Sequence, residues 1–254
     1  MTLKKIYLAS AFLLLSSAVH ATDIFASGKP VEMSVGAEVK PDFTVGGYSI
    51  YQGAGNWRLF KSESSTSSAR GEATSVNLGW VSLFELVDPQ TNAYVGMDMT
   101  VNLSSGGPND YWTGNPCAGV HLAAVNKAQG QDDNCMTIDV KAGPTGSKGA
   151  ENFIVRSTQS ASSGRLFAIA IALPIRMLGL PDSSDANWTS AAVEADPAKA
   201  AVLNRVKEWA VQLQDASRKA IGFSKPQDAF AAVPSYRTLM KAPVSATNTA
   251  EVSN

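Results

Sequence analysis

The side chains with the widest chemical scope in this chain are His121, Cys117 and Cys135. Histidine is the usual general base of a Ser-His-Asp or Cys-His site, but no GxSxG motif or other nucleophile signature accompanies His121. The only other histidine, His20, lies in a segment that we expect to be removed, so a zinc site built on several histidines is excluded. We expect no catalytic residue, no metal and no cofactor; a plain surface-loop position is the alternative role for His121.

The two cysteines, Cys117 and Cys135, lie 18 residues apart. This spacing is too wide for a redox CxxC motif, and the histidine or cysteine partners of a zinc site are missing. The spacing therefore predicts a structural disulfide that closes a loop of this size.

The stretch 104–134 runs for 31 residues between two expected strands. Most connections have about 4–6 residues, and connections as long as this one are often functional. We expect ligand or partner contacts from Asp110, Tyr111, Trp112 and His121, because Tyr111 and Trp112 offer a stacking surface for a sugar, a peptide or a protein. The alternative is that Trp112 covers the end of the sheet. A short helix is expected from Val120 to Ala128.

Acidic residues leave a hydrolase open as the second hypothesis, because any two carboxyl groups can meet in space. No pair stands out in the sequence. Asp98 lies in the middle of an apolar strand, where an outward-facing position on the polar side is the simplest reading. The alternative function is thus a cell-envelope hydrolase that uses acidic residues or the 104–134 loop.

Residues 1–21 have the pattern of a bacterial secretory signal peptide. Lys4 and Lys5 precede an apolar run from Ile6 to Val19, and cleavage is expected before Thr22. The run has 14 residues, whereas a membrane-spanning helix needs about 20. No cysteine follows it to carry a lipid. We expect an exported protein, periplasmic or secreted, with no membrane span after cleavage.

Charge argues against nucleic acid as a partner. Removal of residues 1–21 leaves 19 basic and 22 acidic residues, a formal charge of −3, with no basic cluster. Binding to phosphates needs a clustered positive surface. The expected partner is a protein, peptide, carbohydrate or apolar ligand.

Alternating apolar residues predict an antiparallel sheet over the middle of the chain. Residues Ser75–Val87 carry apolar side chains on both faces and predict a strand buried on both sides, whereas Ala93–Leu103 has one apolar face. The serine-rich stretch Ser62–Ala69 reads as a solvated loop. The other expected strands are Trp57–Lys61, Met136–Lys141, Phe153–Gln159 and Arg165–Leu173.

A long amphipathic helix is predicted from Pro197 to Ala220. Its apolar residues are spaced by four and three along one stripe, Asp196 is a suitable N-cap, and Gly222 is a suitable stop. We expect the stripe to cover the apolar face of the hairpin formed by Ser75–Val87 and Ala93–Leu103. Residues 242–254 show no period and are expected to form a flexible tail.

Together these patterns predict an α+β fold, an antiparallel β-meander of at least five strands packed against a long C-terminal helix. We expect one exported domain over 22–241. The arrangement resembles helix-grip and PsbP-like folds in outline, on the order of its elements alone. The sequence favours a non-catalytic binding or interaction protein, with a site in the disulfide-containing loop 104–134 or between helix and sheet.

Overall fold

The computed structural model describes residues 22–53, 55–68, 75–90, 92–104, 115–130, 132–142, 151–161, 163–180, 188–222 and 224–240. The expected signal peptide, the expected tail 242–254, and Asp110, Tyr111 and Trp112 lie outside the described residues. Seven antiparallel strands form the main sheet, in the order β6-β7-β8-β12-β11-β10-β9. They are β6 (Arg58–Ser68), β7 (Ser75–Asp88), β8 (Ala93–Asn102), β9 (Ala123–Asn126), β10 (Asn134–Ala142), β11 (Glu151–Ala161) and β12 (Arg165–Pro174).

The α+β prediction is confirmed, with a strand order that is not one uninterrupted meander. Strands β6 to β8 follow one another, and so do β9 to β12, but β8 pairs with β12. The chain therefore leaves the middle of the sheet after Asn102 and enters its far edge at Ala123. This crossing explains the length of the connection that the sequence analysis singled out.

Alternation divides the side chains of the sheet between an inner and an outer face. In β8, Val95, Met97, Met99 and Val101 are buried while Tyr94 and Asp98 are exposed. The expected outward position of Asp98 is confirmed. The prediction that Ser75–Val87 is buried on both sides is wrong, since the set that includes Trp80 and Phe84 is only partly buried.

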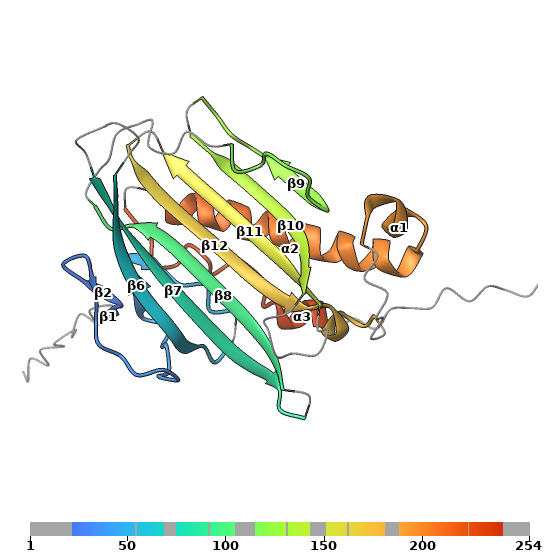
Figure 1. Cartoon of the computed structure of the whole chain (residues 1–254), viewed down its shortest axis with the longest axis horizontal. Coiled ribbons are helices and arrows are strands. Elements are labelled where there is room, and N and C mark those ends of the chain that lie inside the picture. The colour runs from blue at the N-terminus through green and yellow to red at the C-terminus, as the bar shows by residue number, and fades with distance from the viewer. Residues whose placement is uncertain are drawn as a thin grey trace, which may run out of the picture.

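The predicted helix is confirmed as α2 (Pro197–Ala220). The Asp196 carboxylate accepts hydrogen bonds from the backbone N–H groups of Ala198 and Lys199, and Pro197 begins the helix where no intrahelical donor is needed. Its apolar stripe packs on β10, β11 and β12, not on the β7–β8 hairpin that we expected. Figure 1 shows α2 behind these strands, on the inner face of the sheet.

The inner face of β6 to β8 is covered instead by the N-terminal arm and the C-terminal segment. Tyr51 in the arm donates through its hydroxyl to the Pro234 carbonyl and accepts from the Tyr236 N–H. Phe25 lies against Gly79 of β7, which leaves room for the ring because it has no side chain. The arm and C-terminal region contain β1 (Thr22–Asp23), β2 (Phe25–Ala26), β3 (Lys29–Pro30), β4 (Phe43–Val45), β5 (Tyr48–Ser49), η1 (Ile175–Leu178), α1 (Ser190–Glu194) and α3 (Arg237–Met240).

Two local predictions are wrong. The expected loop Ser62–Ala69 is strand as far as Ser68, because every residue from Ser62 to Ser68 pairs with a residue of β7. The expected helix Val120–Ala128 is instead the edge strand β9, which pairs with β10. In both places pairing with a neighbouring strand overrides the local preference of the sequence.

Candidate functional site

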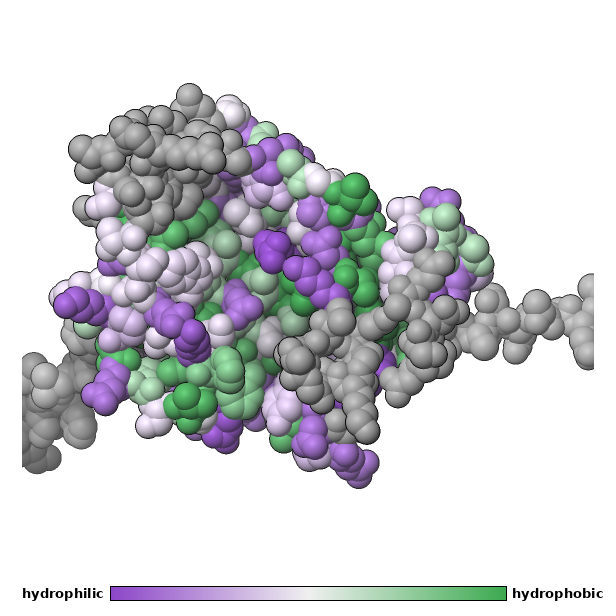
Figure 2. Space-filling model, in the orientation of Figure 1, coloured by the Kyte–Doolittle hydropathy of each residue, from purple (hydrophilic) through white to green (hydrophobic). Residues whose placement is uncertain are grey.

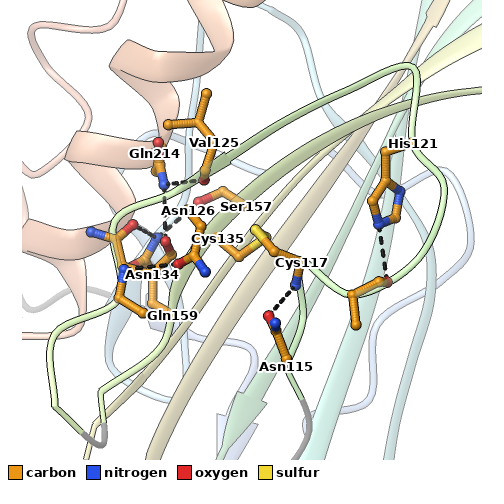
Figure 3. Close-up of a disulfide and its surroundings, with 12 residues drawn as sticks. Asn115, Cys117, His121, Val125, Asn126, Asn134, Cys135, Ser157, Gln159 and Gln214 are labelled. Atoms are coloured by element: carbon orange, nitrogen blue, oxygen red, sulfur yellow. Dashed lines mark hydrogen bonds between the residues drawn. A yellow bond between two sulfur atoms is a disulfide. The ribbon is translucent and has the colours of Figure 1, made fainter.

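A disulfide joins Cys117 to Cys135, as predicted, with the two Cα atoms 5.6 Å apart. Cys135 lies in β10 on the side of the sheet away from α2, so the bond ties segment 115–122 down onto the outer face. Figure 3 shows Cys117 and His121 on one side of the strands and Gln214 of α2 on the other. We call segment 115–122 the disulfide loop.

Local hydrogen bonds shape the disulfide loop. The Asn115 side chain accepts from the Cys117 N–H, and the Asn115 carbonyl accepts from the Ala118 N–H. Asparagine favours such turns because its side chain closes on the backbone two residues further on. Gly119 follows with a φ of +116°, a conformation that residues with a side chain rarely adopt. The loop is therefore fixed at both the side-chain and the backbone level.

His121 closes the disulfide loop against β10. Its Nδ1 lies 2.9 Å from the Asp139 carboxylate. Its Nε2 lies 3.2 Å from the Ala118 carbonyl oxygen, the contact that a dashed line marks at His121 in Figure 3. The two side chains of the pair are 16% and 20% exposed. Both ring nitrogens therefore lie within hydrogen-bond distance of an oxygen, one in β10 and one in the loop itself. His121 thus connects the disulfide loop to β10 through both sides of its ring.

The tip of the disulfide loop presents an apolar side chain. Val120, between Gly119 and His121, is 101% exposed, the largest value among the exposed large hydrophobic side chains of the described residues. The loop thus holds a valine away from the core on a backbone with little freedom.

Beneath the disulfide loop, on the inner face, lies a buried network of amides that sequence reasoning missed. Gln214 of α2 donates to the Val125 and Asn134 carbonyls, at 3.0 and 3.2 Å. Gln159 of β11 donates to the Asn134 side chain and to Ser157. Polar residues at inward positions of β10 and β11 were the only signal in the sequence. The network fixes β9, β10 and β11 to one another and to the helix.

Ion pairs extend this connection around the edge of the sheet. Lys127, after β9, lies 2.6 Å from Asp215, and Asp132, before β10, lies 2.9 Å from Arg218. Both partners are on α2. The helix therefore holds the ends of the β9–β10 connection, which supports the strand beneath the disulfide loop.

A second polar cluster joins the arm to the C-terminal segment, far from the disulfide in sequence. Lys225 donates to the Gly46 carbonyl at 2.7 Å and lies over the Tyr48 ring. Burial lowers the pKa of Lys225, Asp23 raises it, and Arg165 lowers it. Burial raises the pKa of Tyr48 and of Tyr51. The contacts of Lys225, Tyr48 and Tyr51 hold the N-terminal arm against the C-terminal segment.

Nothing among the described residues resembles a metal site, since no three His, Cys, Asp or Glu side chains come together there. Within the same residues no helix is long and apolar enough to span a membrane. The disulfide fits a secreted protein, because disulfides persist in oxidising compartments.

Comparison with known proteins supplies no relative. No family model, no curated protein and no solved structure matches this chain.

Proposed function

We propose that this chain is an exported bacterial protein, periplasmic or secreted, that binds a partner protein through the disulfide loop without catalysing a reaction. The observation that carries the proposal is the engagement of His121 by Asp139 and Ala118. It gives the one histidine of the described residues a structural role in presenting Val120.

Rigidity favours this use of the loop. A segment that is ordered before binding loses less conformational entropy when the complex forms. The disulfide, the Asn115 turn and the His121 contacts restrict the loop in advance. A fixed apolar side chain at the tip then serves as an anchor for a pocket on another protein.

The interior is a less favourable place for a ligand. The apolar stripe of α2 is buried in the core, with Val202, Val206, Trp209 and Leu213 among the strands. Trp209 also donates through its ring N–H to the Pro234 carbonyl. These side chains already contact the protein's own core, so we place the binding surface outside.

Photo-crosslinking from position 120 tests the proposal. Benzoyl-phenylalanine placed at Val120, in protein exported by its own bacterium, should yield one discrete cross-linked protein. The matched control is the same probe at Val35, an apolar residue that is 72% exposed in the N-terminal arm. We expect no discrete product there.

Binding must then be measured with purified components. The partner identified by mass spectrometry should bind Val120→Asp at least roughly tenfold more weakly than the wild type, because a buried carboxylate replaces an anchor. Val35→Asp should bind like the wild type. Equal affinity of the two variants, or no discrete product from position 120, would overturn the proposal.

A further inference from the structure

Beside the disulfide loop, the outer face of β7, β8 and β12 has exposed apolar side chains and no covering element among the described residues. Trp80 and Phe84 of β7 are partly exposed there, and Tyr94 of β8 and Leu86 of β7 are exposed. The Phe84 and Tyr94 rings contact each other edge to face, with centroids 5.8 Å apart. Figure 2 shows this face, where apolar side chains lie between separate polar ones. A surface of this kind is typical of an interaction site.

The side chains in the middle of this face are short. β12 is the central strand of the seven, and in its middle the outward side chains are Ala168, Ala170 and Ala172, between Leu166 and Pro174. All three are partly exposed. Short side chains along the central strand let a second surface approach closely there.

Opposite charges flank the central strand at the same level. Ala170 pairs with Asp98 of β8 on one side and with Arg156 of β11 on the other. Both charged side chains are exposed. Neither has an ion-pair or hydrogen-bond partner within the described ranges. The face therefore carries one acid and one base at equal distances from its central strand.

From this symmetry we infer that the outer face binds a second copy of this chain, about a twofold axis that runs along β12. The rotation places β8 of one copy over β11 of the other. Asp98 then faces the partner's Arg156, and Arg156 faces the partner's Asp98, so the charges match twice. Interfaces between identical subunits are mostly of this twofold kind.

The same rotation gives the disulfide loop its contact. Cys135 and Asp139, which hold the loop on β10, share rows of the sheet with Trp80 and Phe84 of β7. β10 and β7 lie two strands from β12 on opposite sides. The loop of each copy therefore lies over the aromatic strand of the other. The inference names the partner of the proposed function and rests on it for this loop contact.

Sheet twist does not oppose the arrangement. Rotation about the central strand turns a twisted sheet into a surface of the same twist, so the gap between the two copies stays even. Two sheets that pack face to face normally keep their strands nearly aligned. The alanines on the axis and the raised loops at the sides are consistent with one continuous contact.

Charge exchange tests the inference on the full mature chain. Sedimentation and light scattering should find a dimer for the wild type. Asp98→Arg and Arg156→Asp should each weaken self-association at least roughly tenfold, because like charges then face each other across the interface. An equimolar mixture of the two variants should form a heterodimer, and the double variant should dimerise again. Glu208→Arg, which changes an exposed acid of α2 on the other side of the sheet, is the matched control and should not affect the dimer.

The outcomes separate this inference from the proposed function. A monomer at every concentration, or a dimer indifferent to both charge changes, would overturn the inference. A monomer that cross-links from position 120 to a different protein would leave the proposed function standing. A dimer that obeys the charge exchange but gives no cross-link from position 120 would overturn the proposed function alone.

Discussion

Tyr48 and Tyr51 bring two phenols into the core where the arm meets the C-terminal segment. Both are almost fully buried, and burial raises the pKa of each above the ordinary value of 10.0. In the unfolded chain the phenols ionise at the ordinary value. The folded state therefore holds these protons more tightly than the unfolded state.

The resulting prediction concerns alkaline pH. The contribution of Tyr48 to stability is present in full below pH 10.0 and is lost as the pH rises above that value, because the unfolded state then gains from ionisation. Tyr48→Phe should lose less stability than the wild type between about pH 9 and pH 11. Urea unfolding followed by tryptophan fluorescence across this range measures it.

Tyr94→Phe is the control for this experiment, because it changes an exposed tyrosine. It should lose stability with pH as the wild type does. If Tyr48→Phe loses as much stability as the wild type between about pH 9 and pH 11, ionisation of the buried Tyr48 does not cause that loss.

Single residues were predictable where the spacing itself carried the information. The Cys117–Cys135 disulfide was predictable because the spacing of the two cysteines left few other roles for them, and the structure confirms it. The partner of His121 was not predictable, since Asp139 reaches it only through the register of β10. The roles of His121, Asp110, Tyr111 and Trp112 in binding stay predictions.

Among the elements, α2 has the clearest start and stop signals in its own sequence. Asp196 accepts hydrogen bonds from the N–H groups of Ala198 and Lys199, and Arg218 and Lys219 lie in the last turn. A carboxylate at the start and cations at the end both match the helix dipole. These signals are local, which is why the bounds of this helix were predicted correctly.

Removal of the cap should weaken the whole protein. Asp196→Ala should lower the free energy of unfolding by about 1 kcal/mol, because two backbone donors lose their acceptor. Asp196→Asn keeps a side-chain acceptor and should recover most of the loss. Chemical denaturation of the three proteins measures the difference. Equal losses in both variants would point to the charge of Asp196 and not to its capping bonds.

The two misjudged elements share a physical cause. β6 and β9 are the edge strands of the main sheet, and both are rich in small or polar residues. An edge strand buries little, so its sequence carries a weak apolar pattern. β6 is a strand because it pairs with β7, and β9 is a strand because it pairs with β10. The local sequence of a segment does not show which strand it will pair with.

The crossing from β8 to β9 and the disulfide within it organise the molecule as a whole. The bond joins the incoming chain to β10 across 18 residues. A closed loop of this size restricts the unfolded chain by about 3 kcal/mol. The order of the strands was beyond sequence reasoning, because the pairing of β8 with β12 depends on contacts far apart in the chain.

Loss of the disulfide should lower the stability of the whole protein and increase local opening of the disulfide loop. The double variant Cys117→Ser, Cys135→Ser should unfold with about 3 kcal/mol less free energy. Amide hydrogens of the disulfide loop should exchange faster, while those of α2 follow only the global change. Denaturant unfolding with hydrogen exchange read by mass spectrometry measures both. Unchanged exchange in the loop would show that His121 and Asn115 hold it without the bond.

The β8–β12 pairing has a consequence for the order in which the protein is made. β8 meets its neighbour β12 only after the intervening strands have been synthesised, and Tyr51 meets Pro234 across 183 residues. The two runs of neighbouring strands, β6 to β8 and β9 to β12, therefore cannot join into one sheet until β12 has been made, and folding governed by such distant contacts is slow. A polypeptide with this order of strands completes its fold only after its last segments have been made, so a truncated chain that ends before β12 should lack the joined sheet.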